Sequence, residues 1–268
     1  MKKIDRLSEI SELYDAYIID LWGVMHNGIQ LNHGAVNATD NLMKKNKKIY
    51  FLSNAPRPQK DVAKFLKDLG MNEKYFNCIF TSGEASIEAI KENKYGKNFY
   101  HLGPDKDNPL FDGINKNRTS ILKCDYIVCT GLFDEQMENL NYYNNLLKNY
   151  VSKKMICTNP DLHVHRGNKL EYCAGKIASI FENLGGEVIY FGKPHKEIYK
   201  PLVNLKEKTL VIGDNLRTDI KGANNMNLDS IFISKGVHRK EISNESDFKK
   251  LEERYKVKIK YFQSELVW

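Results

Sequence analysis

The sequence has no apolar run close to the roughly 20 residues that a membrane-spanning helix needs. Its five cysteines form no Cys-x-x-Cys pair, and an odd number does not suit a framework of disulfides. The first fifteen residues mix charged and apolar side chains and lack the apolar stretch of a signal peptide. We therefore expect a protein of a reducing compartment, most simply the cytoplasm, and no membrane partner.

The sequence also lacks internal repeats, low-complexity linkers and blocks of basic residues interleaved with aromatic ones. The net charge is +7, but the lysines are scattered along the chain, as on an ordinary solvated surface. We therefore expect no nucleic-acid partner. A basic balance is equally compatible with a small phosphorylated substrate.

Short apolar runs that end in polar or glycine-containing turns are what the sequence does contain. Most of them lead into a helix-compatible stretch, and 41% of the 268 residues are hydrophobic, enough for a sizeable core. Strands that alternate with helices predict an α/β fold with a parallel sheet covered on both faces. The runs are residues 16–19, 49–52, 188–191, 209–212 and 230–233.

The middle of the chain has strand candidates of its own. They are residues 98–102, 126–129 and 154–157, with a helix-compatible stretch at 135–149. We predict that residues 84–188 form a second α/β unit, inserted into a first unit made of residues 1–83 and 189–268.

Asp20 follows the first apolar run and precedes Gly23, which allows a tight turn. A carboxylate at the end of a strand can attack phosphorus and form an aspartyl-phosphate, which divides one difficult step into two. The alternative is an aspartate that only caps the turn.

Ser53 and Asn54 follow a second strand, where a hydroxyl and backbone amides can hold a phosphoryl oxygen. Both residue types are also common helix caps. Lys193 precedes Pro194 after a third strand, and its charge could neutralise both a nucleophile and a phosphoryl group. The alternative is a surface lysine before a helix.

Asp214 and Asp219 follow the run 209–212 in one loop-to-helix segment. Ligand sites of parallel α/β sheets lie at the carboxyl ends of the strands, so both carboxylates could meet Asp20 there. Three carboxylates make an oxygen-rich site that suits Mg²⁺. The alternative is an acidic helix cap.

The order of these four motifs along the chain resembles the haloacid dehalogenase (HAD) superfamily, in its NagD-like branch, subfamily IIA. Further matches are the segments TSGEA at 81–85 and TNPD at 158–161, so the resemblance covers nearly the whole chain. It implies a Rossmann-like core with an inserted α/β cap. It also implies Mg²⁺-dependent hydrolysis of a small phosphorylated metabolite, and it is compatible with a homodimer.

The resemblance also implies roles for the motif residues. Asp20 would be the nucleophile and a metal ligand, Asp214 a second ligand, and Asp219 a support for the metal's outer shell. The backbone carbonyl of Trp22 would be a further ligand. The implied phosphate-binding residues are Ser53, Asn54 and Lys193.

Trp22 departs from the family pattern, because most members carry at this position a second aspartate that protonates the leaving group and activates water. An indole is only a hydrogen-bond donor, and acid–base help is typically worth about 10²–10⁴-fold. Three interpretations follow. The leaving group needs little protonation, as in anhydrides, acyl or aryl phosphates; or His26, the nearest titratable group, substitutes; or the site binds a phosphorylated ligand with little or no hydrolysis. A dehalogenase fits less well, since that chemistry needs no metal.

His163 and His165 alternate on an extended segment and would share one face, like a pair of metal ligands. No third ligand is evident, so we favour another role. In the NagD-like branch the corresponding cap loop faces the substrate. We therefore expect Asp161, His163 and His165 to shape substrate specificity.

Overall fold

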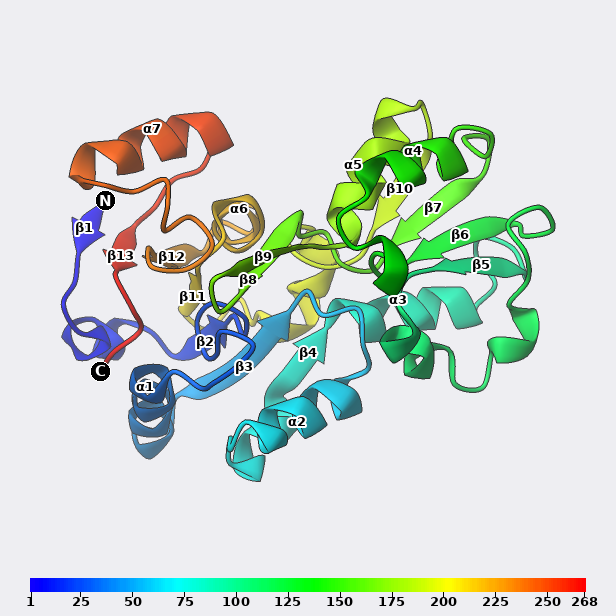
Figure 1. The fold of residues 1–268 in the computed structure, drawn as a ribbon. Coiled ribbons are helices and arrows are strands. Elements are labelled where there is room, and N and C mark those ends of the chain that lie inside the picture. Colours follow the sequence, from blue (N-terminus) through cyan, green and yellow to red (C-terminus); the bar gives the residue numbers. More distant parts are fainter.

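The computed structural model describes all 268 residues and contains two separate parallel sheets (Figure 1). The larger one has seven strands, and every neighbouring pair in it is parallel. Its order is β1 (Lys2–Lys3), β13 (Tyr261–Gln263), β12 (Asp229–Ile233), β11 (Thr209–Gly213), β2 (Ala16–Ile19), β3 (Lys48–Ser53) and β4 (Ile79–Thr81).

Helices cover both faces of this sheet, because its central strands are apolar on both sides. On β2, Ile19 packs into one hydrophobic cluster, which includes side chains of α1 (His33–Lys44) and α2 (Gln59–Asp68). The neighbouring Ile18 packs into a cluster on the other face. On that face lie α6 (Lys221–Asn225) and α7 (Glu245–Tyr255), opposite α1 and α2 (Figure 1).

The smaller sheet has four parallel strands, β10 (Glu187–Tyr190), β7 (Lys154–Cys157), β6 (Tyr126–Cys129) and β5 (Phe99–Leu102). Residues of α4 (Leu140–Leu147) and α5 (Ala174–Asn183) pack on one of its faces, and α3 (Ser82–Lys91) contributes to the cluster on the other. An antiparallel hairpin of β8 (His163–Arg166) and β9 (Lys169–Tyr172) lies between the two sheets (Figure 1).

The predicted α/β class with a parallel sheet is confirmed. The strand expected at 188–191 is β10, and it pairs with β7 of the smaller sheet rather than with the larger one. The predicted division between residues 188 and 189 therefore falls inside a strand. The sequence reasoning did not identify β1, β4, β13 or the hairpin. None of the helices combines the length and apolar character needed to cross a membrane.

Three adjacent strands of the larger sheet bring three of the four predicted motifs to one edge. β2 pairs with β3 on one side and with β11 on the other, all in the same direction. Asp20, Ser53 and Asp214 therefore lie at the same ends of neighbouring strands. This is the edge where parallel α/β sheets bind ligands.

Candidate active site

Lys193 forms a buried ion pair with two of the predicted site residues. Its ammonium lies 2.5 Å from Asp20 Oδ1 and 2.6 Å from Asp219 Oδ1, and it donates to the carbonyl oxygen of Leu52 at 2.9 Å. All three charged side chains are at most 8% exposed. Burial alone would lower the pKa of Lys193, but the two negative charges outweigh it and hold that pKa well above its usual range.

Asp20, Asp214 and Asp219 form an acidic cluster, with one carboxylate oxygen of each within 4.8 Å of the others. Burial raises the pKa of Asp20 well above its ordinary value, despite the opposing charge of Lys193. Burial and the charge of Asp219 raise the pKa of Asp214 to about 8. Both shifts mean that the ionised forms of these carboxyl groups are disfavoured unless a further positive charge lies beside them.

The donor set of this cluster fits a hard divalent cation. With all three carboxyl groups ionised, their charges and the one ammonium would sum to a formal −2, which such an ion would balance. Oxygen-only ligands are the ones that Mg²⁺ prefers.

Two glycines leave room for the Asp214 carboxylate. A Cβ at Gly23 would come within 2.0 Å of Asp214 Oδ2, and one at Gly236 within 2.1 Å. Gly23 also has φ +90°, a conformation that side-chain-bearing residues rarely adopt. The backbone N–H of Val237 donates to the same oxygen at 2.7 Å and fixes its orientation.

Asn54 connects the end of β3 to the lysine loop. Its Oδ1 accepts from the backbone N–H of Lys193 at 2.8 Å, and its Nδ2 donates to the Lys193 carbonyl oxygen at 3.2 Å. The neighbouring Ser53 is buried, and its Oγ accepts from the backbone N–H of Ala55 at 3.2 Å. Both side chains line the same cavity as the acidic cluster. Asn54 therefore helps to hold Lys193 in place.

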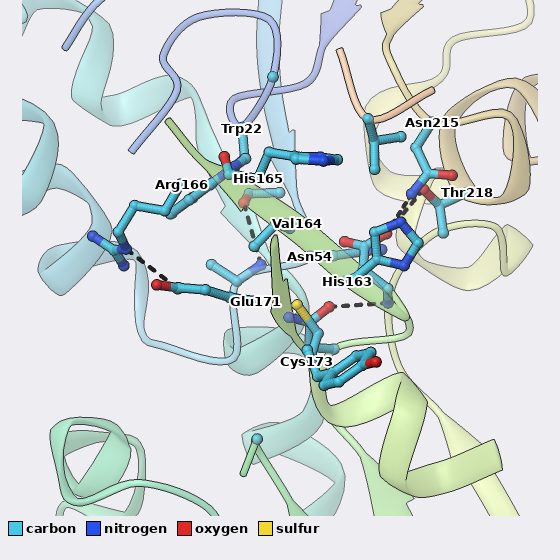
Figure 2. A pocket seen from close by; sticks show the side chains of 18 of the residues that line it. Trp22, Asn54, His163, Val164, His165, Arg166, Glu171, Cys173, Asn215 and Thr218 are labelled. Atoms are coloured by element: carbon cyan, nitrogen blue, oxygen red, sulfur yellow. Dashed lines mark hydrogen bonds and ion pairs between the residues drawn. The ribbon is translucent and has the colours of Figure 1, made fainter. Parts of the chain in front are cut away.

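Trp22 also lines this cavity, but its side chain is directed to the hairpin (Figure 2). The indole Nε1 donates to the carbonyl oxygen of His165 at 3.0 Å. The guanidinium carbon of Arg166 lies 5.3 Å from the centre of the indole ring, at the distance of a cation–π contact. The only hydrogen-bond donor of the indole is therefore occupied by the hairpin.

His26 does not line the cavity, although the sequence suggests it as a substitute acid. It is buried edge-on between Trp22 and Phe65, and its Nδ1 accepts from the backbone N–H of Gly28 at 3.1 Å. Burial lowers the pKa of His26 to about 4, so the ring is neutral near pH 7. This placement gives no support to His26 as the missing proton donor.

The structure brings all three predicted specificity residues to the cavity. Asp161 Oδ1 accepts from Asn215 Nδ2 and from Thr218 Oγ1, both at 3.1 Å. His163 lies near these two residues, and His165 lies on the Trp22 side (Figure 2). Asp161 therefore ties one end of the hairpin segment to the loop that carries Asp214.

Two cavity residues were missed by the sequence reasoning. Arg57 follows β3, and Asp107 lies in the 3₁₀ helix Asp105–Phe111 after β5 of the smaller sheet. Arg57 Nε lies 3.8 Å from Asp107 Oδ1, and burial raises the pKa of Asp107 to about 6. No local pattern marks either residue, because only the packing of the two sheets brings them together.

Comparison with known proteins agrees with this geometry. A family model described as haloacid dehalogenase-like hydrolase matches residues 17–115, and a related HAD-like hydrolase model matches residues 190–254. An acid sugar phosphatase of Staphylococcus saprophyticus is 28% identical over 241 residues, which cover 85% of this chain and 89% of that protein.

Solved structures of similar fold include members of the same family. A hydrolase of the haloacid dehalogenase-like family from Brucella suis 1330 is 30% identical, with a TM-score of 0.87 over 98% of this chain and 100% of its own. A structure described as a putative nagD protein is 25% identical, with a TM-score of 0.63 over 82% of this chain and 88% of its own.

Proposed function

Because the chain belongs to the haloacid dehalogenase-like family and is an enzyme of that superfamily, we propose that it is a phosphatase for a small phosphorylated metabolite. The observation that carries the proposal is the buried contact between Asp20 and Lys193 beside Asp214 and Asp219. The acid sugar phosphatase and nagD-like relatives support placing it in the NagD-like branch. The smaller sheet, up to Tyr190, would then be the inserted cap.

In the proposed reaction an Asp20 carboxylate oxygen attacks phosphorus. The bond from phosphorus to the leaving oxygen breaks, and that oxygen keeps the electron pair. Water then attacks the aspartyl-phosphate, releasing phosphate and restoring the Asp20 carboxylate. Lys193, 2.5 Å from Asp20, would offset the charge of the incoming phosphoryl group, and Ser53 and Asn54 would contact its oxygens.

Mg²⁺, held by Asp20, Asp214 and the Trp22 carbonyl with support from Asp219, would supply further positive charge for the phosphoryl oxygens. Without that charge, the buried carboxylates repel an anionic substrate. We therefore propose that the activity depends on Mg²⁺.

We further propose that preferred substrates have leaving groups that need little protonation, such as acyl phosphates, aryl phosphates and anhydrides. The Trp22 indole donates its N–H to His165 and cannot donate it to a leaving oxygen as well. The same contact favours the second candidate function, a protein that binds a phosphorylated ligand with little or no hydrolysis.

A panel containing a sugar phosphate, p-nitrophenyl phosphate and acetyl phosphate, assayed with Mg²⁺, separates the two candidates. A phosphatase releases phosphate from at least one compound, and the Asp20→Asn variant loses that turnover. No turnover on any compound, with retained binding of a phosphorylated ligand, would support the second function and overturn the first.

A further inference from the structure

Trp22 lies at the centre of a docked contact between the loop after β2 and the β8–β9 hairpin. Its indole N–H donates to the His165 carbonyl oxygen at 3.0 Å. Two residues further along, at the turn of the hairpin, the backbone N–H of Gly167 donates to the carbonyl oxygen of Asn27 at 3.0 Å. The two elements are 143 residues apart in sequence at the Trp22–His165 bond, so only the tertiary structure joins them.

Arg166 strengthens the same contact from the hairpin side. Its guanidinium lies over the Trp22 ring at 5.3 Å, and its Nη1 donates to the Gly28 carbonyl oxygen at 3.4 Å. Its Nε contacts Glu171 Oε2 on β9 at 3.3 Å. Arg166 therefore links both strands of the hairpin to the loop that begins beside Asp20.

The loop backbone leaves space for the indole. Gly28 has φ +84°, and a Cβ there would lie 2.5 Å from Trp22 Cζ2. A side chain at Gly28 would push the ring away from its present place. The ring is also in edge contact with buried His26, at a centroid distance of 5.1 Å. The indole is thus held on three sides, by Gly28, His26 and Arg166.

We propose that Trp22 is a positioning residue that fixes the β8–β9 hairpin against the cavity. The hairpin presents His163 and His165 to the cavity (Figure 2). Asp161 holds the chain just before the hairpin by its contacts with Asn215 and Thr218, while Trp22 holds the end near the turn. The docking itself is independent of the proposed function, but its consequence for substrate choice rests on the proposed phosphatase activity.

Hydrogen exchange of the hairpin amides tests the docking directly. Trp22→Phe keeps an aromatic ring but removes the N–H, and Arg166→Met keeps the alkyl stem but removes the charge. Each should speed exchange in residues 163–172 by about fivefold, the effect of losing one ordinary hydrogen bond. Lys169→Ala is the matched control, because this hairpin side chain is 66% exposed and does not line the cavity.

Exchange in α1 of the same samples shows whether a variant is loosened as a whole. Faster exchange confined to the hairpin in both variants supports the docking. The docking proposal is overturned if the hairpin amides of both variants exchange at the wild-type rate. It is also overturned if exchange in α1 rises as much as exchange in the hairpin.

A kinetic comparison tests the consequence for substrates. In Trp22→Phe, the ratio of kcat/KM for a sugar phosphate to that for p-nitrophenyl phosphate should shift by at least about fivefold, mainly through KM. An unchanged ratio in a variant with a loosened hairpin overturns the role in substrate choice. A wild type without any turnover overturns the phosphatase proposal instead, and the exchange experiment still decides the docking.

Discussion

The ammonium of Lys193 lies 2.5 Å from the carboxylate of Asp20, and neither side chain is more than 8% exposed. A second carboxylate, Asp219, lies 2.6 Å from the same ammonium. Buried charges of this kind are tolerated only when they are paired, so the lysine is part of the stability of this edge of the sheet as well as of its proposed chemistry.

Lys193→Met should therefore destabilise the protein strongly. It leaves Asp20 and Asp219 buried without their cation, and breaking such a pair typically costs about 3–5 kcal/mol. Urea unfolding at pH 7 without metal measures the change. Lys200→Met is the control, since that side chain is 65% exposed and pairs only with Glu197 at 3.4 Å. Equal losses in the two variants would contradict the structural importance of the pair.

Mg²⁺ should raise the melting temperature of the wild type, because it would neutralise buried carboxylates in the folded state only. Chelation should reverse the shift. Asp214→Ala should abolish most of it, while Asp112→Ala, at an exposed carboxylate paired only with Lys60, should not. An Mg²⁺ shift of the same size in Asp214→Ala would argue against the acidic cluster as the metal site.

His26 should make the protein sensitive to acid. Its pKa in the folded protein, about 4, lies below its ordinary value of 6.5. Between these values the unfolded chain binds more protons, so the free energy of unfolding falls as the pH drops through this window. From pH 6.5 to pH 5 the loss attributable to this residue is at most about 2 kcal/mol.

Unfolding of His26→Gln at pH 7 and pH 5 measures that contribution. The variant should lose less stability between the two pH values than the wild type does. His33→Gln, at an exposed histidine, should behave like the wild type. If His26→Gln were as acid-sensitive as the wild type, the buried neutral ring would not be responsible.

Much of the site could be predicted because its residues directly follow strands. Asp20, Ser53 and Asp214 come at the carboxyl ends of β2, β3 and β11, and neighbouring parallel strands meet at one edge. Lys193 follows a predicted strand too, but that strand belongs to the smaller sheet. The apolar residues of this strand do not reveal which of the two sheets it joins.

The contacts between the sheets could not be predicted from the sequence. The Trp22 bond to the His165 carbonyl involves a backbone atom, and Arg57 approaches Asp107 only because the two units pack together. No hydrophobic periodicity or motif spacing in the sequence marks either of these two contacts. His26 is close to Trp22 in sequence, but it packs into the protein instead of lining the cavity, because its ring is enclosed by aromatic neighbours.

The Trp22→Asp variant tests whether the lack of an acidic side chain at position 22 limits hydrolysis. The new carboxylate could protonate a leaving oxygen and raise the turnover of a sugar phosphate by up to about 10²-fold, while hydrolysis of acetyl phosphate gains little. Loss of the His165 contact should raise KM for both compounds. A steady-state comparison with the wild type measures both effects. Efficient sugar phosphate hydrolysis by the wild type, with no gain in Trp22→Asp, would show that the missing acid is not limiting.

Phosphate release from acetyl phosphate and p-nitrophenyl phosphate, measured with Mg²⁺ in the wild type beside Asp20→Asn, tests whether Asp20 acts as the nucleophile of a phosphatase. The wild type should release phosphate, and the variant should lose more than about 10³-fold of that rate, because Asp20 is the proposed nucleophile. Equal turnover in the two proteins would contradict it.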